Sequence, residues 1–294
     1  MGDGRGLFVA VMPGLFVVLW STGFIGAKFG LPYAEPFTFL ALRFTLVIAL
    51  LAAVAAATRA PWPRDQRLLG HLAVSGVLVH GVYLGGVFAA IDRGLPSGLT
   101  ALIVGLQPVL TAMAAGRWLG ESVSLRQWLG LALGLGGVAL VLSTRLTVVA
   151  GAPLNWGGVA FAVAALLGIT AGTLWQKRHC TGMDLRTGAV VQYLAALMPM
   201  LAAALAFETM DIRWTGDFVF ALAWLVLVLS VGAISLLMTL IRLGEAARTA
   251  SFFYLVPPVT AVMAWALFDE ALSPLALAGM AVAALGVALV VRRS

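Results

Sequence analysis

Ten long apolar runs, separated by short connections that hold most of the charge, constrain this chain more than any other feature. A helix needs about 20 apolar residues to cross the ~30 Å hydrocarbon core of a bilayer. Only 10% of the 294 residues are charged, against about 25% in soluble domains. We therefore expect an all-α, polytopic membrane protein. The predicted spans are 8–28, 37–57, 68–91, 95–116, 125–144, 154–176, 186–207, 218–241, 246–267 and 273–291.

The positions of the charged residues predict orientation and argue against nucleic-acid binding. The net charge is +6, but the basic residues are scattered singly and form no stripe. Cytoplasmic connections carry an excess of Lys and Arg, and thirteen of the 18 basic residues fall on the side that holds both termini. We expect both termini in the cytoplasm and a first span that is not cleaved. The single cysteine, Cys180, excludes an intrachain disulfide and a cysteine metal site.

The second half of the chain repeats the first with a shift of 149 residues. This shift carries Pro108 onto Pro257, Glu121 onto Glu270, and Lys28 onto Lys177. It also carries Gly130 and Gly137 onto Gly279 and Gly286. We predict two units, 1–146 and 150–294, each with five spans. An odd number of spans turns the second unit upside down, and inverted repeats are an architecture of secondary transporters.

Several motifs resemble those of a known family. Trp20-Ser21-Thr22-Gly23 is similar to the signature that opens many EamA-type members of the drug/metabolite transporter superfamily. The stretches from Gln107-Pro108 to Glu121 and from Pro257-Pro258 to Glu270 resemble the ends of that family's repeat, with a glycine-rich span after each. The resemblance covers essentially the whole chain and leaves the substrate open.

The resemblance implies ten helices in two inverted five-helix repeats around a central cavity. Helices 1, 3, 4, 6, 8 and 9 would line the cavity, with helices 5 and 10 at the periphery. It also implies a bacterial inner-membrane exporter, resembling the exporters of aromatic and neutral amino acids. Export of drugs or other small metabolites, with or without proton coupling, is the alternative. The expected partners are the substrate and lipid, and the expected state is a monomer, with a dimer as the alternative.

Polar and aromatic side chains inside the spans are the candidate substrate-binding residues, since such groups are costly in lipid unless they face a cavity or a partner helix. His80 and Tyr83 share a helical face, although His80 could instead bond a neighbouring helix. Trp175 could instead anchor a helix at the headgroups. The full set is His80, Tyr83, Trp20, Ser21, Gln107, Thr111, Trp175 and Tyr254.

Prolines and charged residues within the spans have two interpretations each. Pro108, Pro257 and Pro258 free backbone carbonyls, which predicts either hinges or locally repaired kinks. Arg43 could pair with Glu35 or a carbonyl, or meet a substrate carboxylate. Lys28 and Lys177 could snorkel to water, and Glu121 and Glu270 favour a structural role near helix starts. The small-xxx-small spacing around Gly130 and Gly134 predicts close helix packing, with a dimer face as the alternative.

Other functions lack their residues in this sequence. There is no HExxH, no GxSxG and no intramembrane aspartate pair, so we do not expect an enzyme. No Walker motif, cofactor site or metal site is present in the sequence. Rings of charged side chains, which would predict a channel, are absent too. Sparse charge argues against sugar phosphates and favours amino acids. We expect facilitated export, with proton coupling through His80 as the alternative.

Overall fold

The computed structural model describes residues 3–95, 100, 103–146, 155–244, 246–268 and 273–291, and these are helical apart from short connections and one isolated bridge between Ala34 and Ile212. The first repeat contains α1 (Asp3–Gly30), α2 (Pro36–Ala57), α3 (Gln66–Gly76), η2 (Val77–Val82), α4 (Tyr83–Asp92), α6 (Gln107–Leu119) and α7 (Leu125–Leu146). The second contains α8 (Trp156–His179), α9 (Leu185–Phe207), α10 (Gly216–Trp224), η3 (Leu225–Ala233), α11 (Ile234–Leu243), α12 (Ala246–Ser251), η4 (Phe252–Leu255), α13 (Val256–Phe268) and α14 (Pro274–Val291). A short turn, η1 (Leu31–Tyr33), joins α1 to α2.

Six helical segments of the described chain are long and apolar enough to cross a membrane. Two shorter apolar stretches, Val11–Gly23 and Leu125–Val141, lie within α1 and α7. The predicted spans agree with the helices to within a few residues at most ends, as 37–57 does with α2. The predicted span 95–116 falls partly outside the described residues. The chain is a multi-pass membrane protein.

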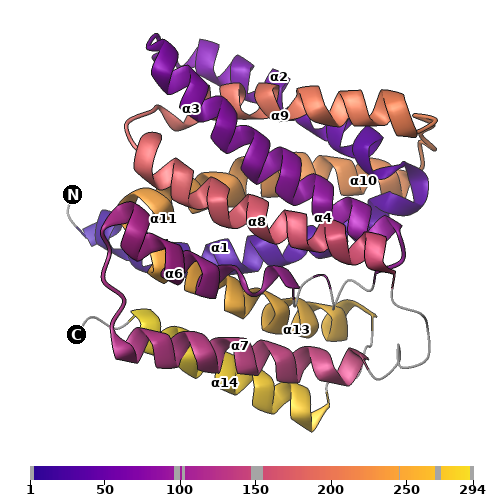
Figure 1. Ribbon diagram of the computed structural model, residues 1–294. Coiled ribbons are helices and arrows are strands. Elements are labelled where there is room, and N and C mark those ends of the chain that lie inside the picture. Colours follow the sequence, from indigo (N-terminus) through magenta and orange to yellow (C-terminus); the bar gives the residue numbers. More distant parts are fainter. Residues whose placement is uncertain are drawn as a thin grey trace.

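Two pairs of helices that the 149-residue shift relates, α2 with α9 and α7 with α14, pack on each other in antiparallel fashion. The carboxylate of Glu208, after α9, accepts from the backbone N–H of Thr38 at the start of α2 at 2.7 Å. At the opposite end, Thr187 near the start of α9 donates to the carbonyl of Pro61, beyond α2, at 2.8 Å. The two helices therefore run in opposite directions, side by side at the upper edge of Figure 1.

Glycines allow the second antiparallel pair, α7 and α14, to approach closely. A Cβ atom added at Gly137 would lie 2.4 Å from the backbone nitrogen of Ala283, and one added at Gly286 would lie 2.4 Å from that of Gly134. Gly137 and Gly286 are equivalent under the 149-residue shift, so the contact is symmetric. The pair forms the lower edge of the molecule in Figure 1. The small residues predicted to pack helices closely therefore do so within the chain.

The repeat extends to irregular turns of the helices. Both third spans change to π-helix, over 77–82 in the first repeat and 225–233 in the second. Both fourth spans are broken, by a turn over 103–106 and by the 3-10 helix η4 at 252–255. Each pair of irregular segments overlaps under the same shift. Broken helices at corresponding positions of two repeats are the feature that points to a binding site in transporters.

The centre of the molecule lies where the two repeats exchange contacts. In the first repeat α1 packs against η3 and α13 of the second, and in the second α8 packs against η2 and α6 of the first. These are again equivalent pairs, since α8 corresponds to α1. The largest apolar core cluster spans both halves and includes Phe16, Phe39, Tyr83 and Leu237. A site at this centre would be built from both repeats.

Candidate functional site

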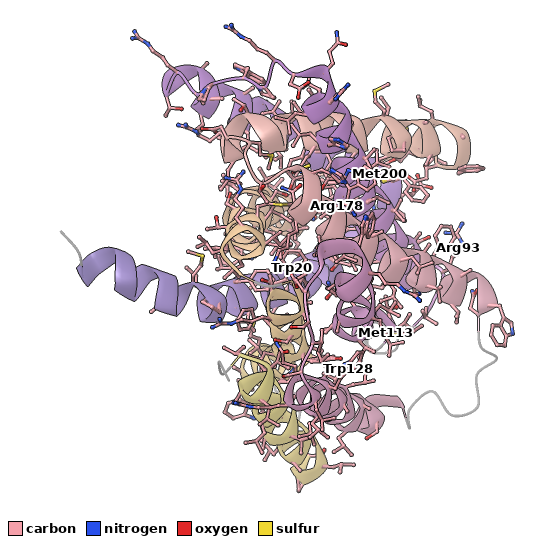
Figure 2. All side chains as sticks on the ribbon, turned by 60° about the vertical axis from the view of Figure 1, so that its left-hand side comes forward. Trp20, Arg93, Met113, Trp128, Arg178 and Met200 are labelled. Carbon is pink, nitrogen blue, oxygen red and sulfur yellow. The ribbon has the colours of Figure 1, made fainter. Side chains whose placement is uncertain are left out.

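A cavity of about 470 Å³, counting the part that is open, lies at the contact between the repeats. Trp20 on α1 and Tyr83 on α4 stack across it, with ring centroids 6.2 Å apart and planes 15° apart. Figure 2 places Trp20 near the centre of the molecule. Among the described residues, the lining consists of Trp20, Gly23, Ala27, Arg43, Tyr83, Leu84, Val87, Phe88, Leu229 and Ile234. The structure thus brings two predicted site residues together.

Arg43 supplies charge to this cavity although it lies inside the apolar helix α2. Its side chain is 1% exposed, and Nε donates to the hydroxyl of Ser230 at 2.9 Å. The Nη1 atom is buried without a hydrogen-bond partner. The expected pairing with Glu35 is wrong, because Glu35 instead accepts from the hydroxyl of Thr209 at 2.9 Å and from its backbone N–H.

Arg43 did not belong to the predicted set of site residues, although contact with a substrate carboxylate was one of its predicted interpretations, and its position shows why it was left out of the set. The resemblance assigns the cavity lining to helices 1, 3, 4, 6, 8 and 9, whereas Arg43 comes from the second helix. The available signal was the residue itself, a cation within an apolar run, since ionisable residues inside spans usually serve a function. The π-helical stretch that holds Ser230 supplies its hydroxyl acceptor.

His80 lies beside the cavity and does not line it. Its ring stacks on Tyr193 at 4.1 Å between centroids and meets Phe44 edge-on at 6.3 Å. Neither ring nitrogen has a hydrogen-bond partner in the described part of the chain. The alternative interpretation, a hydrogen bond to a neighbouring helix, is therefore not observed there. His80 is fully buried behind aromatic rings.

Two predicted residues lie at a second, smaller cavity or next to it. This cavity of about 240 Å³, again counting the part that is open, is lined by Gln107, Thr173, Leu237, Ile241, Ala246, Thr249, Ala250 and Phe253. Gln107 donates to the hydroxyl of Thr111 at 3.3 Å, and its carbonyl oxygen is buried without a partner. Phe253 also packs edge-on against Trp20, at 5.2 Å between centroids. An aromatic contact thus lies between the two cavities.

Three other predicted residues line neither cavity. The Ser21 hydroxyl donates to the carbonyls of Val17 and Val256, which ties α1 to α13. Trp175 packs against His71, Trp118 and His179 at the end of α8. The ring of Tyr254 covers Gly134 of α7, and its hydroxyl is buried without a partner. Their predicted role in substrate binding has no support from position.

The prolines of the fourth and ninth spans start helices. Pro108 is the second residue of α6, and Pro257 and Pro258 are the second and third residues of α13. Proline suits the first turn of a helix, where its missing N–H would have no intrahelical partner. Each helix follows the irregular turn that breaks its span, at 103–106 or at 252–255. The prolines therefore mark the discontinuities of these two spans.

An ion pair joins three helix ends on the side predicted to face the cytoplasm. Lys177 Nζ lies 2.5 Å from Glu121 Oε1, and Glu121 Oε2 accepts from the backbone N–H of Ala246 at 2.8 Å. The prediction that Glu121 has a structural role fits these contacts, although the helix start it serves is α12. The side chain of Lys28 and all of Glu270, their equivalents, lie outside the described residues.

Comparison with known proteins agrees with the duplicated fold. At 28% identity the chain is similar to "Uncharacterized transporter YvbV" of Bacillus subtilis, over 97% of this chain and 92% of the relative. The "Probable terminal-alkyne amino-acid exporter" of Streptantibioticus cattleyicolor is 28% identical, over 95% and 92%. The "Probable amino-acid metabolite efflux pump" of Escherichia coli is 26% identical, over 90% and 88%.

A solved crystal structure shares the fold, with a TM-score of 0.78 at 20% identity, covering 95% of this chain and 94% of that chain. The EamA-like transporter family matches twice, over residues 5–143 and 156–292. These two segments fall within the two units that the repeat predicts. The chain, which holds two copies of the EamA domain, therefore belongs to the EamA-like transporter family.

Proposed function

We propose that this protein is a secondary transporter that exports neutral and aromatic amino acids from the cytoplasm by alternating access. The observation that carries the proposal is the central cavity, which both repeats line and which combines Trp20 and Tyr83 with the cationic Arg43. Aromatic and apolar walls with a few placed polar groups are typical of small-molecule sites. Two relatives named for amino-acid export or efflux support the substrate class.

The proposed topology has ten spans in two inverted five-helix repeats, in a bacterial inner membrane, with both termini in the cytoplasm. The antiparallel packing of α2 on α9 and of α7 on α14 supports the inversion. The excess of Lys and Arg on one side supports the orientation. In this orientation the larger cavity, which reaches Ala27 and Phe88, lies towards the outside, and the smaller cavity lies towards the cytoplasm.

Alternating access requires that the barrier between these cavities moves. Phe16, Trp20 and Phe253 form that barrier, with ring centroids 5.2–5.3 Å apart. Phe253 lies in η4, the 3-10 helix that breaks the ninth span, and Pro257 and Pro258 follow it at the start of α13. In the proposed mechanism these prolines and Pro108 are hinges, since interrupted helices at equivalent positions can bend as the two halves rock.

Facilitated export, driven by the gradient of the substrate, is the proposed energy source. The burial of His80 behind Tyr193, away from the cavity lining, supports it over proton coupling. A His80→Gln variant in proteoliposomes tests this choice. We expect unchanged transport and an unchanged response to an imposed pH gradient. Transport that continues but loses a response seen in the wild type would contradict the facilitated mechanism.

Counterflow tests the substrate class. Proteoliposomes would be loaded with mixed unlabelled amino acids and given radiolabelled threonine, methionine or phenylalanine outside. We expect saturable accumulation that unlabelled amino acids compete away, strongest for phenylalanine because the cavity walls are aromatic. Absence of accumulation, in protein whose folding is verified by thermal unfolding, would overturn the assignment to amino acids.

A further inference from the structure

The guanidinium of Arg43 has no carboxylate partner among the residues that the structure describes. It is 1% exposed, its Nη1 lacks a hydrogen-bond partner, and its Nε donates to the neutral hydroxyl of Ser230. Arginine remains charged at all physiological pH values. A buried charge is usually paired, since an unpaired one is costly. The described residues thus leave this charge incompletely satisfied.

The position of Arg43 indicates which group would pair with its charge. The side chain forms part of the wall of the 470 Å³ cavity, and the other lining residues are uncharged in the described part of the chain. A planar guanidinium matches a carboxylate in size and geometry and can bind it through two parallel hydrogen bonds. A ligand that enters the cavity would meet this charge next to the Trp20 and Tyr83 rings.

We infer that the carboxylate is the obligatory recognition group of the substrate and that its amino group is dispensable. This inference rests on the proposed function and names the substrate class of the same site as apolar monocarboxylates, of which neutral amino acids are one group. Arg43 is the residue that determines this specificity. Its Nε–Ser230 hydrogen bond fixes the guanidinium in the cavity wall, and the buried Nη1 lacks an acceptor among the described residues, which a substrate oxygen would supply.

The rest of the cavity lining explains why a single carboxylate on the substrate is enough for recognition. Leu84, Val87, Leu229 and Ile234 offer an apolar wall to the remainder of the substrate. No lining residue within the described chain is acidic, so an ammonium group finds no counter-charge there. A cation without a carboxylate would be repelled by Arg43. A phosphate or dicarboxylate would bring a second negative charge that the wall does not neutralise.

A series of phenylalanine derivatives tests the inference on the wild-type protein. Each compound competes with radiolabelled phenylalanine in the counterflow assay, with protein-free liposomes as the background. We expect 3-phenylpropionate, which lacks the amine, to compete within about threefold of phenylalanine. Phenylethylamine and phenylalaninol, which lack the carboxylate, should be at least ~30-fold weaker, as for loss of a buried charge-assisted contact.

Variants assign the effect to Arg43. Arg43→Gln should raise the half-saturating concentration of phenylalanine at least ~30-fold. Arg43→Lys keeps the charge, loses the planar fork and should give an intermediate value. Gln192→Leu is the matched control, since Gln192 is the buried equivalent of Arg43 in α9 and does not line the cavity. Its half-saturating concentration should stay within about twofold of the wild type.

Ligand-dependent thermal stabilisation of the purified protein separates this inference from the proposed function. Stabilisation by 3-phenylpropionate that Arg43→Gln abolishes supports the carboxylate site, even if no amino acid is transported and the proposed function fails. If phenylalanine is transported but phenylethylamine competes with it as strongly as 3-phenylpropionate does, the inference is overturned and the proposed function stands. Absence of both transport and stabilisation would overturn both.

Discussion

The two repeats share their helices, their π-helical stretches and their broken spans, yet they differ in the polar groups at equivalent positions. Arg43 of α2 corresponds to Gln192 of α9. Arg43 reaches Ser230 and the central cavity, whereas Gln192 donates to Gln176 at 2.6 Å in a neutral cluster with Ser75. The backbone therefore retains the duplication, while the side chains have diverged so that one half carries the charge. The proposed carboxylate site therefore lies where the two repeats differ.

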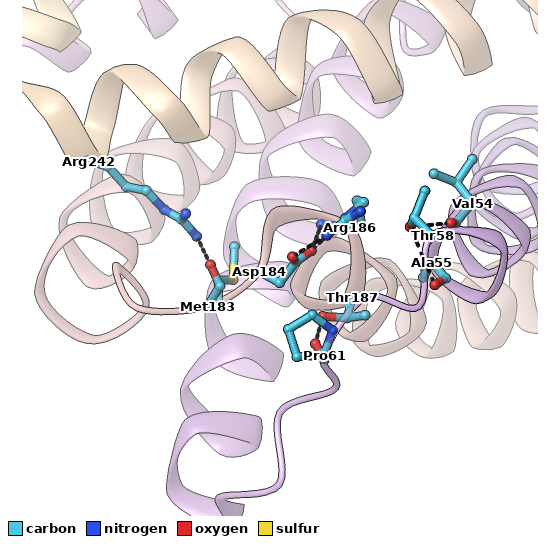
Figure 3. A network of polar contacts seen from close by, with 9 residues as sticks. All are labelled: Val54, Ala55, Thr58, Pro61, Met183, Asp184, Arg186, Thr187 and Arg242. Carbon is cyan, nitrogen blue, oxygen red and sulfur yellow. Dashed lines mark hydrogen bonds and ion pairs between the residues drawn. The ribbon is translucent and has the colours of Figure 1, made fainter.

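The two ends of the α2–α9 pair show the same divergence. Thr38 and Thr187 are equivalent, and each donates its hydroxyl to the segment that follows the opposite helix. The acceptor for Thr38 is the carboxylate of Glu208, and the acceptor for Thr187 is the carbonyl of Pro61. Figure 3 shows the end predicted to face the cytoplasm, where Asp184 pairs with Arg186. The same geometry thus uses a side-chain carboxylate as the acceptor at one end and a backbone carbonyl at the other.

The largest expected effect comes from giving the second repeat the charge of the first. In Gln192→Arg the guanidinium would replace a buried amide in a cluster that has no carboxylate among its described members. Gln192 is fully buried and its backbone packs against Gly76, so a larger side chain would have to displace its neighbours. We expect a loss of more than ~3 kcal/mol in unfolding free energy, seen as loss of the monodisperse peak on size exclusion.

Gln192→Leu is the control for Gln192→Arg, because it removes the polarity of the side chain without adding charge. Wild-type stability of Gln192→Arg would mean that α9 accommodates a buried cation as α2 does. In that case the neutral surroundings of Gln192 would not explain the difference between the repeats.

The second prediction sharpens the comparison where the repeats are symmetric. Gly137→Ala and Gly286→Ala each place a Cβ atom 2.4 Å from backbone nitrogen of the opposite helix. Each should lower the unfolding free energy by about 2 kcal/mol, because α7 and α14 must separate. The values should agree within about 0.5 kcal/mol, the scatter expected of independent sites. Chemical unfolding in detergent measures both.

Gly136→Ala is the matched control for the α7–α14 contact. A Cβ atom at Gly136 meets nothing within 4 Å, so alanine should stabilise the helix by up to about 1 kcal/mol. A loss of stability in Gly136→Ala equal to that in Gly137→Ala would show that the effect comes from the helix itself. Unequal losses in Gly137→Ala and Gly286→Ala would show that the contact is less symmetric than its distances.

The sequence predicts the symmetric part of this molecule well. Apolar run length locates helices such as α2 and α9, and the 149-residue shift relates their contacts, because both depend on local pattern. The prolines Pro108 and Pro257 were expected inside spans and instead start helices, since a broken turn precedes each. Breaks and π-helical turns depend on packing between helices, which the pattern of one span does not record.

The candidate site was predictable only in part, for a related reason. Trp20 and Tyr83 were identified because aromatic groups in spans are conspicuous, and they do stack across one cavity. His80, Trp175 and Tyr254 have the same chemical signal but face other helices or ring clusters. Arg43 was named as a possible contact for a substrate carboxylate, but the sequence did not show that it lines a cavity. Which face of a helix meets the cavity depends on its rotation within the bundle.

The third prediction concerns the ion pair between Lys177 and Glu121, whose side chains are 20% and 15% exposed. Glu121→Gln keeps an oxygen for the N–H of Ala246 and loses the ionic attraction. We expect a loss of about 1 kcal/mol, because the pair is partly solvated. A double-mutant cycle with Lys177→Gln measures the coupling by chemical unfolding. Coupling near zero would mean that this end is held by the backbone contacts of Lys177 and Glu121 alone.

The smallest effect is a dependence on pH at the start of α9. Asp184 caps that helix and pairs with Arg186 at 2.7 Å, and the hydrogen bond from Arg186 lowers the pKa of the Asp184 carboxyl to about 2. The unfolded value is about 3.9, so the stabilisation is complete above pH ~4 and is lost as pH falls towards 2. Glu35, the equivalent residue before α2, instead crosses to Thr209.

Asp184→Asn isolates this contribution, because the amide keeps an oxygen for the helix cap and removes the charge. At pH 6 the variant should be less stable by a few tenths of a kcal/mol, since the pair is largely solvated. The difference should shrink as pH falls from 4 towards 2, because the wild-type carboxyl then also becomes neutral. Thermal midpoints of both proteins at pH 6 and pH 3 measure it. A difference that grows on acidification would contradict this prediction. It would mean that other carboxylates cause the acid sensitivity and that the charge of Asp184 does not stabilise the start of α9. Asp184 and Glu35 would then be equivalent in position alone.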